Sequence, residues 1–171
     1  MRRVWISLSL AGVLAVSAAG FQYRGADVQY VSTEPVAQVQ VKAGAATPIT
    51  LKFHVLDGYH VNSNKPRSEL LIPTKLKLTP PLGIGVAALR YPEGKDFSLN
   101  FSPAEVLSVY SGDFAIQASV RPALSALAGA YRVSGELDYQ ACSDRACFPP
   151  KKLPVSFELS VVPTQKTPPA K

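Results

Sequence analysis

Residues 49–55 read ITLKFHV, and this stretch decides the fold. Ile49, Leu51, Phe53 and Val55 are apolar, whereas the three residues between them are polar. Because successive side chains of a β-strand point to opposite faces, a period of two is typical of a strand with one face in the core. The stretch therefore predicts a half-buried strand.

The same alternation recurs along most of the chain, at residues 37–42, 72–78, 114–121, 131–141 and 153–161. Turn residues separate these runs, for example at Asp57-Gly58, Pro80-Pro81 and Ser111-Gly112-Asp113. No run has the period of an amphipathic helix of three turns. The pattern predicts an all-β protein, an immunoglobulin-like antiparallel β-sandwich. Residues 91–103 lack a clear period and predict an irregular, functional loop.

The two ends of the chain differ from this pattern. Arg2 and Arg3 precede an apolar stretch at residues 4–16 and small residues at 17–20, as in a secretory signal peptide that is cleaved near Ala18 or Ala19. An uncleaved anchor is the alternative, but a spanning helix needs about 20 apolar residues. We therefore expect export to the periplasm, with a signal peptide at 1–19, an N-terminal extension at 20–35, a single domain at 36–162 and a disordered tail at 163–171.

Composition narrows the classes of partner. The formal net charge is +6 at pH 7, but the basic residues are scattered and form no nucleic-acid motif. A zinc site needs about four ligands, and the chain has only two histidines, His54 and His60, beside two cysteines. We expect no nucleic acid, no metal, no cofactor and a monomeric protein.

Two further patterns have ordinary explanations. Residues 83–88 match the dinucleotide pattern G-x-G-x-x-A, but they follow Pro80-Pro81 rather than a strand and lead to no long helix. Glu136 and Asp138 place two carboxylates on one strand face, which a solvated strand explains better than a glycosidase pair does.

The chain has only two cysteines, Cys142 and Cys147. A disulfide between them would close a loop of six residues and stabilise the fold by only about 2 kcal/mol, so it would be a poor structural staple. If the strand at 131–141 continues by one residue, Cys142 falls on its polar face. The C-x4-C spacing is not the C-x-x-C of thioredoxins, and spacing alone leaves both a reversible redox couple and an inert disulfide open.

These residues resemble a known family. Residues 139–150 have the pattern Tyr-Gln-x-Cys-x4-Cys-x-Pro-Pro. Two shorter motifs precede them, Asp57-Gly58-Tyr59-His60-Val61 and Val109-Tyr110-Ser111-Gly112. Together the three motifs resemble the amino-terminal periplasmic domain of the thiol:disulfide interchange protein DsbD. The similarity covers residues 36–162. Its cysteine motif is the specific part, because the remainder is ordinary β patterning.

The resemblance implies an immunoglobulin-like domain that passes electrons through a reversible Cys142–Cys147 disulfide. Its implied partners are thioredoxin-fold proteins of the periplasm, in disulfide isomerase reduction or in cytochrome c maturation. Cys147 would form the mixed disulfide with the partner. The family's cap loop matches residues 97–103, with Phe101 as the shield of the pair, and the site would also be lined by Tyr59, His60, Tyr139 and Phe148.

Two departures from the family pattern bear on these expectations. The best-known form of the motif has one more residue between its cysteines. The membrane domain and the thioredoxin-like domain that usually accompany the family are not in this sequence, so the resemblance implies a separate membrane-embedded electron donor. The chain would then be one component of a protein-disulfide reductase system. The alternative function is a non-catalytic β-sandwich adaptor whose small disulfide rigidifies a recognition loop.

Overall fold

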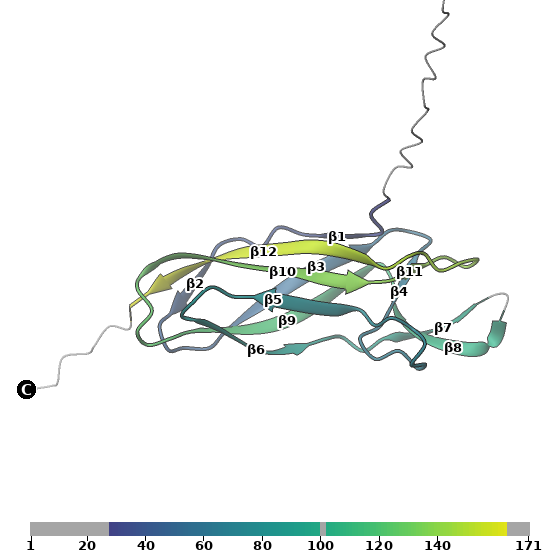
Figure 1. Ribbon diagram of the computed structural model, residues 1–171, viewed down its shortest axis with the longest axis horizontal. Helices are drawn as coiled ribbons and strands as arrows, with labels where there is room; N and C mark the ends of the chain where they lie inside the picture. Colours follow the sequence, from purple (N-terminus) through teal and green to yellow (C-terminus); the bar gives the residue numbers. More distant parts are fainter. Residues whose placement is uncertain (1–27, 100–101, 164–171) are drawn as a thin grey trace, which may run out of the picture.

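The structure of the chain, a computed structural model, describes residues 28–99 and 102–163, with the side chains of residues 99 and 102–104 left undescribed (Figure 1). These ranges contain twelve strands and no helix. The strands are β1 (Val31–Thr33), β2 (Val39–Lys42), β3 (Thr47–Val55), β4 (His60–Asn62), β5 (Lys75–Thr79), β6 (Ile84–Arg90), β7 (Lys95–Leu99), β8 (Ser102–Tyr110), β9 (Asp113–Pro122), β10 (Gly129–Tyr139), β11 (Ala141–Cys142) and β12 (Lys151–Val162).

The described strands form three four-stranded sheets. One has the order β1-β3-β9-β6 and a second has the order β2-β12-β10-β5. The third sheet, β11-β4-β8-β7, lies at one end of the long axis, where the loop after β11 also projects (Figure 1). All pairings are antiparallel except that of β2 with β12, which is parallel. The all-β, immunoglobulin-like sandwich predicted from the sequence is confirmed.

The core lies between the first two sheets and follows directly from the period of two. On β3, Ile49, Leu51, Phe53 and Val55 are buried, while the residues between them are exposed. The alternate apolar residues of β9, β10 and β12 complete the same cluster. Because each strand contributes one apolar face, the two sheets bury those faces against each other.

Two sequence predictions about elements were wrong. Residues 91–103 were expected to be an irregular loop, but β7 and β8 pair there as an antiparallel hairpin, with a register irregularity between Ser98 and Leu99. The strand expected at 72–78 begins only at Lys75. Pro73 cannot donate a ladder hydrogen bond, and Ile72 is 38% exposed rather than facing the core.

The predicted turns lie where the sequence placed them. Gly58 and Gly112 both have positive φ, at 81° and 60°, in the turns that follow β3 and β8. A glycine tolerates this left-handed conformation because it has no Cβ. Within the described ranges, no helix is long and apolar enough to cross a membrane.

Candidate functional site

The two cysteines form a disulfide across a tight turn. Cys142 and Cys147 face each other as an antiparallel bridge, with their Cα atoms 3.9 Å apart. Backbone hydrogen bonds of 2.8 Å from Ser143 N to Ala146 O and from Phe148 N to Ala141 O flank the pair. The Ser143 hydroxyl also accepts hydrogen bonds from backbone amides inside the turn. The four residues between the cysteines are therefore a turn that holds the two sulfurs together.

The two cysteines differ in exposure. Cys142 is fully buried at 0% exposed, whereas Cys147 is exposed. The expectation that Cys142 lies on a polar face was wrong. Strand β10 ends at Tyr139, and after Gln140 the chain crosses to another sheet, where β11 pairs with β4. The alternation of side-chain faces along β10 does not continue past Gln140, and both residues of β11 are buried.

On one side, Cys142 lies beside His60. The two residues are register partners across the β11–β4 ladder, so their side chains project from the same face. His60 is 3% exposed and its ring lies against Phe97 of β7, with centroids 4.4 Å apart. Burial lowers the pKa of His60 below its ordinary 6.5, because the charged imidazolium is poorly solvated there. The imidazole is therefore neutral near pH 7.

On the other side, an aromatic cluster follows Cys147. Phe148 stacks on Tyr30 with centroids 4.9 Å apart, and Tyr59 packs against both rings. The Gln140 side chain donates a hydrogen bond of 3.1 Å to the Phe148 carbonyl. The segment after Cys147 is therefore held by both ring packing and a polar contact.

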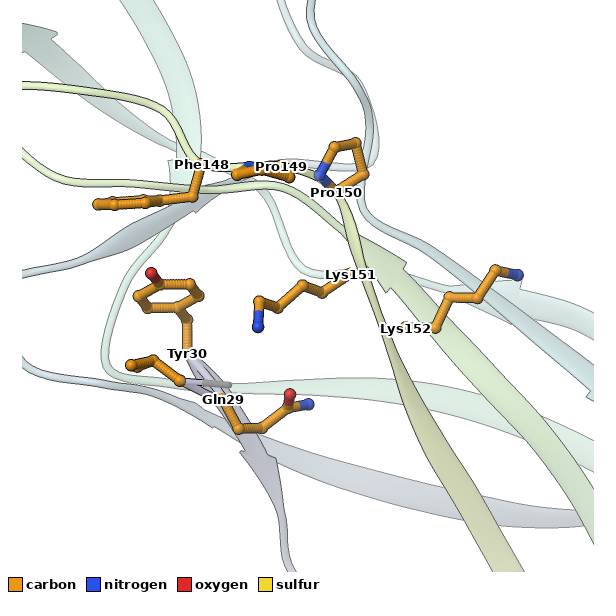
Figure 2. A pocket seen from close by; sticks show the side chains of 8 residues that line it. Gln29, Tyr30, Phe148, Pro149, Pro150, Lys151 and Lys152 are labelled. Atoms are coloured by element: carbon orange, nitrogen blue, oxygen red, sulfur yellow. The ribbon is translucent and has the colours of Figure 1, made fainter. Parts of the chain in front are cut away.

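A pocket of about 510 Å³ opens beside this cluster, and Phe148 to Lys152 form one of its sides (Figure 2). Lys151 extends toward Tyr30, with its Nζ 5.5 Å from the ring centroid, while Lys152 points away. Lys152 pairs instead with Glu136 and Asp138. Lys151 and Lys152 are thus engaged with an aromatic ring and with carboxylates respectively, whereas Arg145, inside the disulfide turn, is exposed.

The predicted site residues fall into three groups. Tyr59, His60 and Phe148 lie around the disulfide turn or on its flanking strand, close to the cysteines. Tyr139 is completely buried in the main core. Phe101 lies outside the described residues, at the β7–β8 connection.

Sequence reasoning missed Tyr30, which precedes β1 and packs on Phe148 and Tyr59. It lies in residues 20–35, for which the sequence predicts an N-terminal extension outside the domain. What reveals it is the pairing of β1 with β3, on which the adjacent Val31 is fully buried, and this pairing is a feature of the fold rather than of the local sequence.

The rejected motifs have plain structural roles. Gly83 lies in a turn, and residues 84–88 lie on β6, which pairs antiparallel with β9, so no dinucleotide loop exists there. Glu136 and Asp138 form ion pairs with lysines of the neighbouring strands. Among the described residues, no cluster of histidine, cysteine, aspartate or glutamate could hold a metal ion.

Several solved structures are similar to this chain at low identity. The reduced DsbD N-terminal domain of Neisseria meningitidis is 23% identical, with a TM-score of 0.37, and the match covers 69% of this chain and 80% of that one. The N-terminal periplasmic domain of ScsB from Proteus mirabilis is 14% identical, with a TM-score of 0.46, and the match covers 76% of this chain and 44% of that one. The DsbD N-terminal domain in complex with the PilB N-terminal domain, also from Neisseria meningitidis, is 21% identical, with a TM-score of 0.38. The match covers 67% of this chain and 77% of that one.

Comparison with curated proteins found no significant match. The family model described as thiol:disulfide interchange protein DsbD, N-terminal, matches residues 27–158. That range spans most of the chain and contains both cysteines, Tyr30 and the whole disulfide turn. The resemblance seen in the sequence is therefore confirmed. The chain belongs to the DsbD N-terminal family, and thiol–disulfide exchange is the chemistry in which it takes part.

Proposed function

We propose that this protein is a periplasmic thiol–disulfide carrier that passes electrons through Cys142 and Cys147 to or from thioredoxin-fold proteins. The observation that carries the proposal is the unequal exposure of the two sulfur-bearing residues. Cys147 is open to a partner, while Cys142 is fully buried behind it. Such an arrangement suits an exchange in which one thiol meets the partner and the other resolves the intermediate.

In the reducing direction, the Cys147 thiolate attacks one sulfur of the partner's disulfide. A mixed disulfide forms, and the partner's other sulfur leaves as a thiolate. Cys142 then loses its proton and attacks the Cys147 sulfur, which forms the Cys142–Cys147 disulfide and releases the second partner thiolate. Two electrons pass to the partner in this sequence, and the released thiolates take up the protons. The opposite direction runs through the same steps in reverse.

The turn geometry supports this role. Hydrogen bonds of the Ser143–Ala146 turn do not involve the sulfur atoms, so this scaffold is available to both redox states. A six-residue loop also loses only about 2 kcal/mol of stabilisation when its disulfide opens. The domain can therefore stay folded while the bond is broken and remade.

We also propose that this exchange takes place in the periplasm. The signal-peptide pattern at residues 1–19 supports export, and the thiol–disulfide interchange family supports an oxidising compartment. We infer that a separate membrane-embedded protein supplies electrons to the pair. The thioredoxin-fold partners are disulfide isomerases that the pair reduces or thioredoxins that act in cytochrome c maturation.

Single-cysteine variants test the division of labour. Cys142→Ser keeps the exposed thiol and removes the resolving one, so it should accumulate a reductant-sensitive covalent complex with a purified thioredoxin-fold protein. Cys147→Ser should not, because its remaining thiol is buried. Gels run with and without reductant measure the complex. Equal trapping by both variants would contradict the assigned roles.

The adaptor alternative predicts a different redox behaviour. A structural disulfide typically has a potential below about −300 mV and resists exchange, whereas a carrier's potential lies near those of its partners. Equilibrating the protein with thioredoxin in buffers of known redox potential measures the reduction potential of the Cys142–Cys147 disulfide. Denaturant unfolding with and without reductant should show a loss of about 2 kcal/mol, and complete unfolding on reduction would favour the adaptor.

A further inference from the structure

His60 is a buried imidazole without a hydrogen-bond partner at one of its nitrogens. Its side chain is 3% exposed, and Nε2 has no partner in the described structure. A buried polar atom left unpaired is costly, so such an atom in a native fold calls for an explanation. Its register partner is Cys142, whose sulfur is bonded to Cys147 in this state and carries no proton.

Reduction of the disulfide gives the Cys142 sulfur a proton, so that its thiol can donate a hydrogen bond. Facing residues of an antiparallel pair have Cβ atoms about 5 Å apart, so an imidazole and a thiol on them are within contact range. We propose that His60 is the proton-transfer residue of the pair, taking the Cys142 thiol proton on Nε2 when Cys142 attacks the mixed disulfide. This inference rests on the carrier function proposed above.

The step balances with the groups named. As the proton moves from the Cys142 sulfur to His60, the Cys142 thiolate forms a bond to the Cys147 sulfur. The bond between Cys147 and the partner breaks, and its electron pair leaves on the partner's sulfur, which takes the proton from imidazolium or water. In the reverse direction, His60 returns a proton to Cys142 as that sulfur leaves.

The surroundings of His60 suit a neutral base. Its ring is covered by Phe97, which keeps water away from one side. Of the ionisable groups on neighbouring elements, Tyr110 of β8 donates its hydroxyl to Asn64, and Asp96 of β7 pairs with Arg67. Lys95 on β7 and Glu105 on β8 are exposed. The thiol of Cys142 is thus the group whose proton His60 is placed to take.

A two-phase reaction with a small aromatic disulfide, 5,5′-dithiobis(2-nitrobenzoate), isolates the step. The reduced protein releases one nitrothiolate when Cys147 forms the mixed disulfide and a second when Cys142 resolves it. His60→Phe keeps an aromatic ring beside Phe97, and His60→Gln keeps polarity, but neither accepts a proton. Both should slow the second phase at pH 7 by about 100-fold, with the first phase unchanged.

The pH profile separates proton transfer from packing. The wild-type second phase should level off above the pKa of His60, below 6.5. In the variants it should keep rising toward the thiol pKa of about 8.5, so the deficit shrinks at high pH. His54→Gln, a change on the exposed outer face of β3, should match wild type. An unchanged second phase, or a deficit equal at every pH, would overturn the inference.

A measurement on the unmutated protein guards against variants that fail to fold. The ring nitrogens of His60 should change their NMR shifts on reduction, because Nε2 gains a thiol donor. Unchanged shifts would overturn the inference. The proposed function is judged separately, since a protein that completes both phases but does not exchange with a thioredoxin-fold protein would refute the carrier role and leave the assignment of His60 standing.

Discussion

Asp138 illustrates how single residues hold the second sheet together. It lies on β10 between Lys77 of β5 and Lys152 of β12, so its carboxylate contacts cations on both neighbouring strands. The hydrogen bond from Lys77 lowers the pKa of Asp138 most, and Lys152 adds to the effect, while partial burial opposes it. A carboxylate with a lowered pKa stabilises the folded state above its unfolded-state pKa.

Asp138→Asn should therefore lower the free energy of unfolding at pH 7 by up to about 1 kcal/mol. The stabilisation is lost as the pH falls through the folded-state pKa, which lies below 3.8, so the difference between variant and wild type should fade in that acid range. Urea unfolding at pH 7 and in that range measures both values. Asp113→Asn, at an 87% exposed carboxylate, is the matched control with a smaller loss. A loss independent of pH would contradict the electrostatic explanation.

At the scale of elements, the β7–β8 hairpin is the part of the molecule that approaches the buried side of the disulfide. It joins the third sheet through β4, the strand that also pairs with β11. Phe97 links the hairpin to His60 and packs near Leu107 and Val109. Residues 97–103, which the family resemblance matched to a cap loop, lie at this hairpin, where the described residues form paired strands rather than an irregular loop.

Phe101→Ala should speed the reaction of the reduced pair with small oxidants several-fold if that ring shields the thiols. Phe97→Ala should have a similar effect, because it uncovers His60 next to Cys142. Stopped-flow measurements of thiol oxidation compare the two variants. Val106→Ala, on the same hairpin and 37% exposed, is the control and should react as wild type does. Unchanged reactivity in Phe101→Ala would remove Phe101 from the site.

For the whole molecule, the first described strand is part of the sandwich. β1 pairs with β3, Val31 is completely buried, and Tyr30 packs in the aromatic cluster beside the disulfide. Burying a large apolar side chain contributes about 1.5–3 kcal/mol. Residues before position 36 therefore contribute both to the core and to the surroundings of Cys147.

A chain that begins at residue 36 should lose about 3 kcal/mol or more of unfolding free energy relative to a chain that begins at residue 28. It should also expose Phe148, which loses its stacking partner Tyr30. Denaturant unfolding of the two chains measures the difference. Equal stabilities would mean that β1 adds nothing to the sandwich.

The sequence by itself determined strands β2, β3, β9, β10 and β12, their core faces and the disulfide candidates, because these depend on local order. The period of two in residues 49–55 and 114–121 matches the buried faces of β3 and β9. The pairing of the β7–β8 segment and the burial of Cys142 depended instead on which strands meet. Local periodicity ends where a strand leaves its sheet, as at Gln140, so phase cannot be extended across that point.

Only the tertiary structure placed His60 opposite Cys142, Phe97 against His60 and Tyr30 over Phe148. These residues come from segments far apart in the chain. Their contacts depend on the register between strands and on how the third sheet joins the sandwich. Register is set by packing between elements, and no local pattern in one strand specifies its neighbour across the ladder. The cysteine pair was visible in the sequence, and the family resemblance named Tyr59, His60 and Phe148 beside it. Tyr30, Phe97 and the pairing of His60 with Cys142 emerged only from the fold.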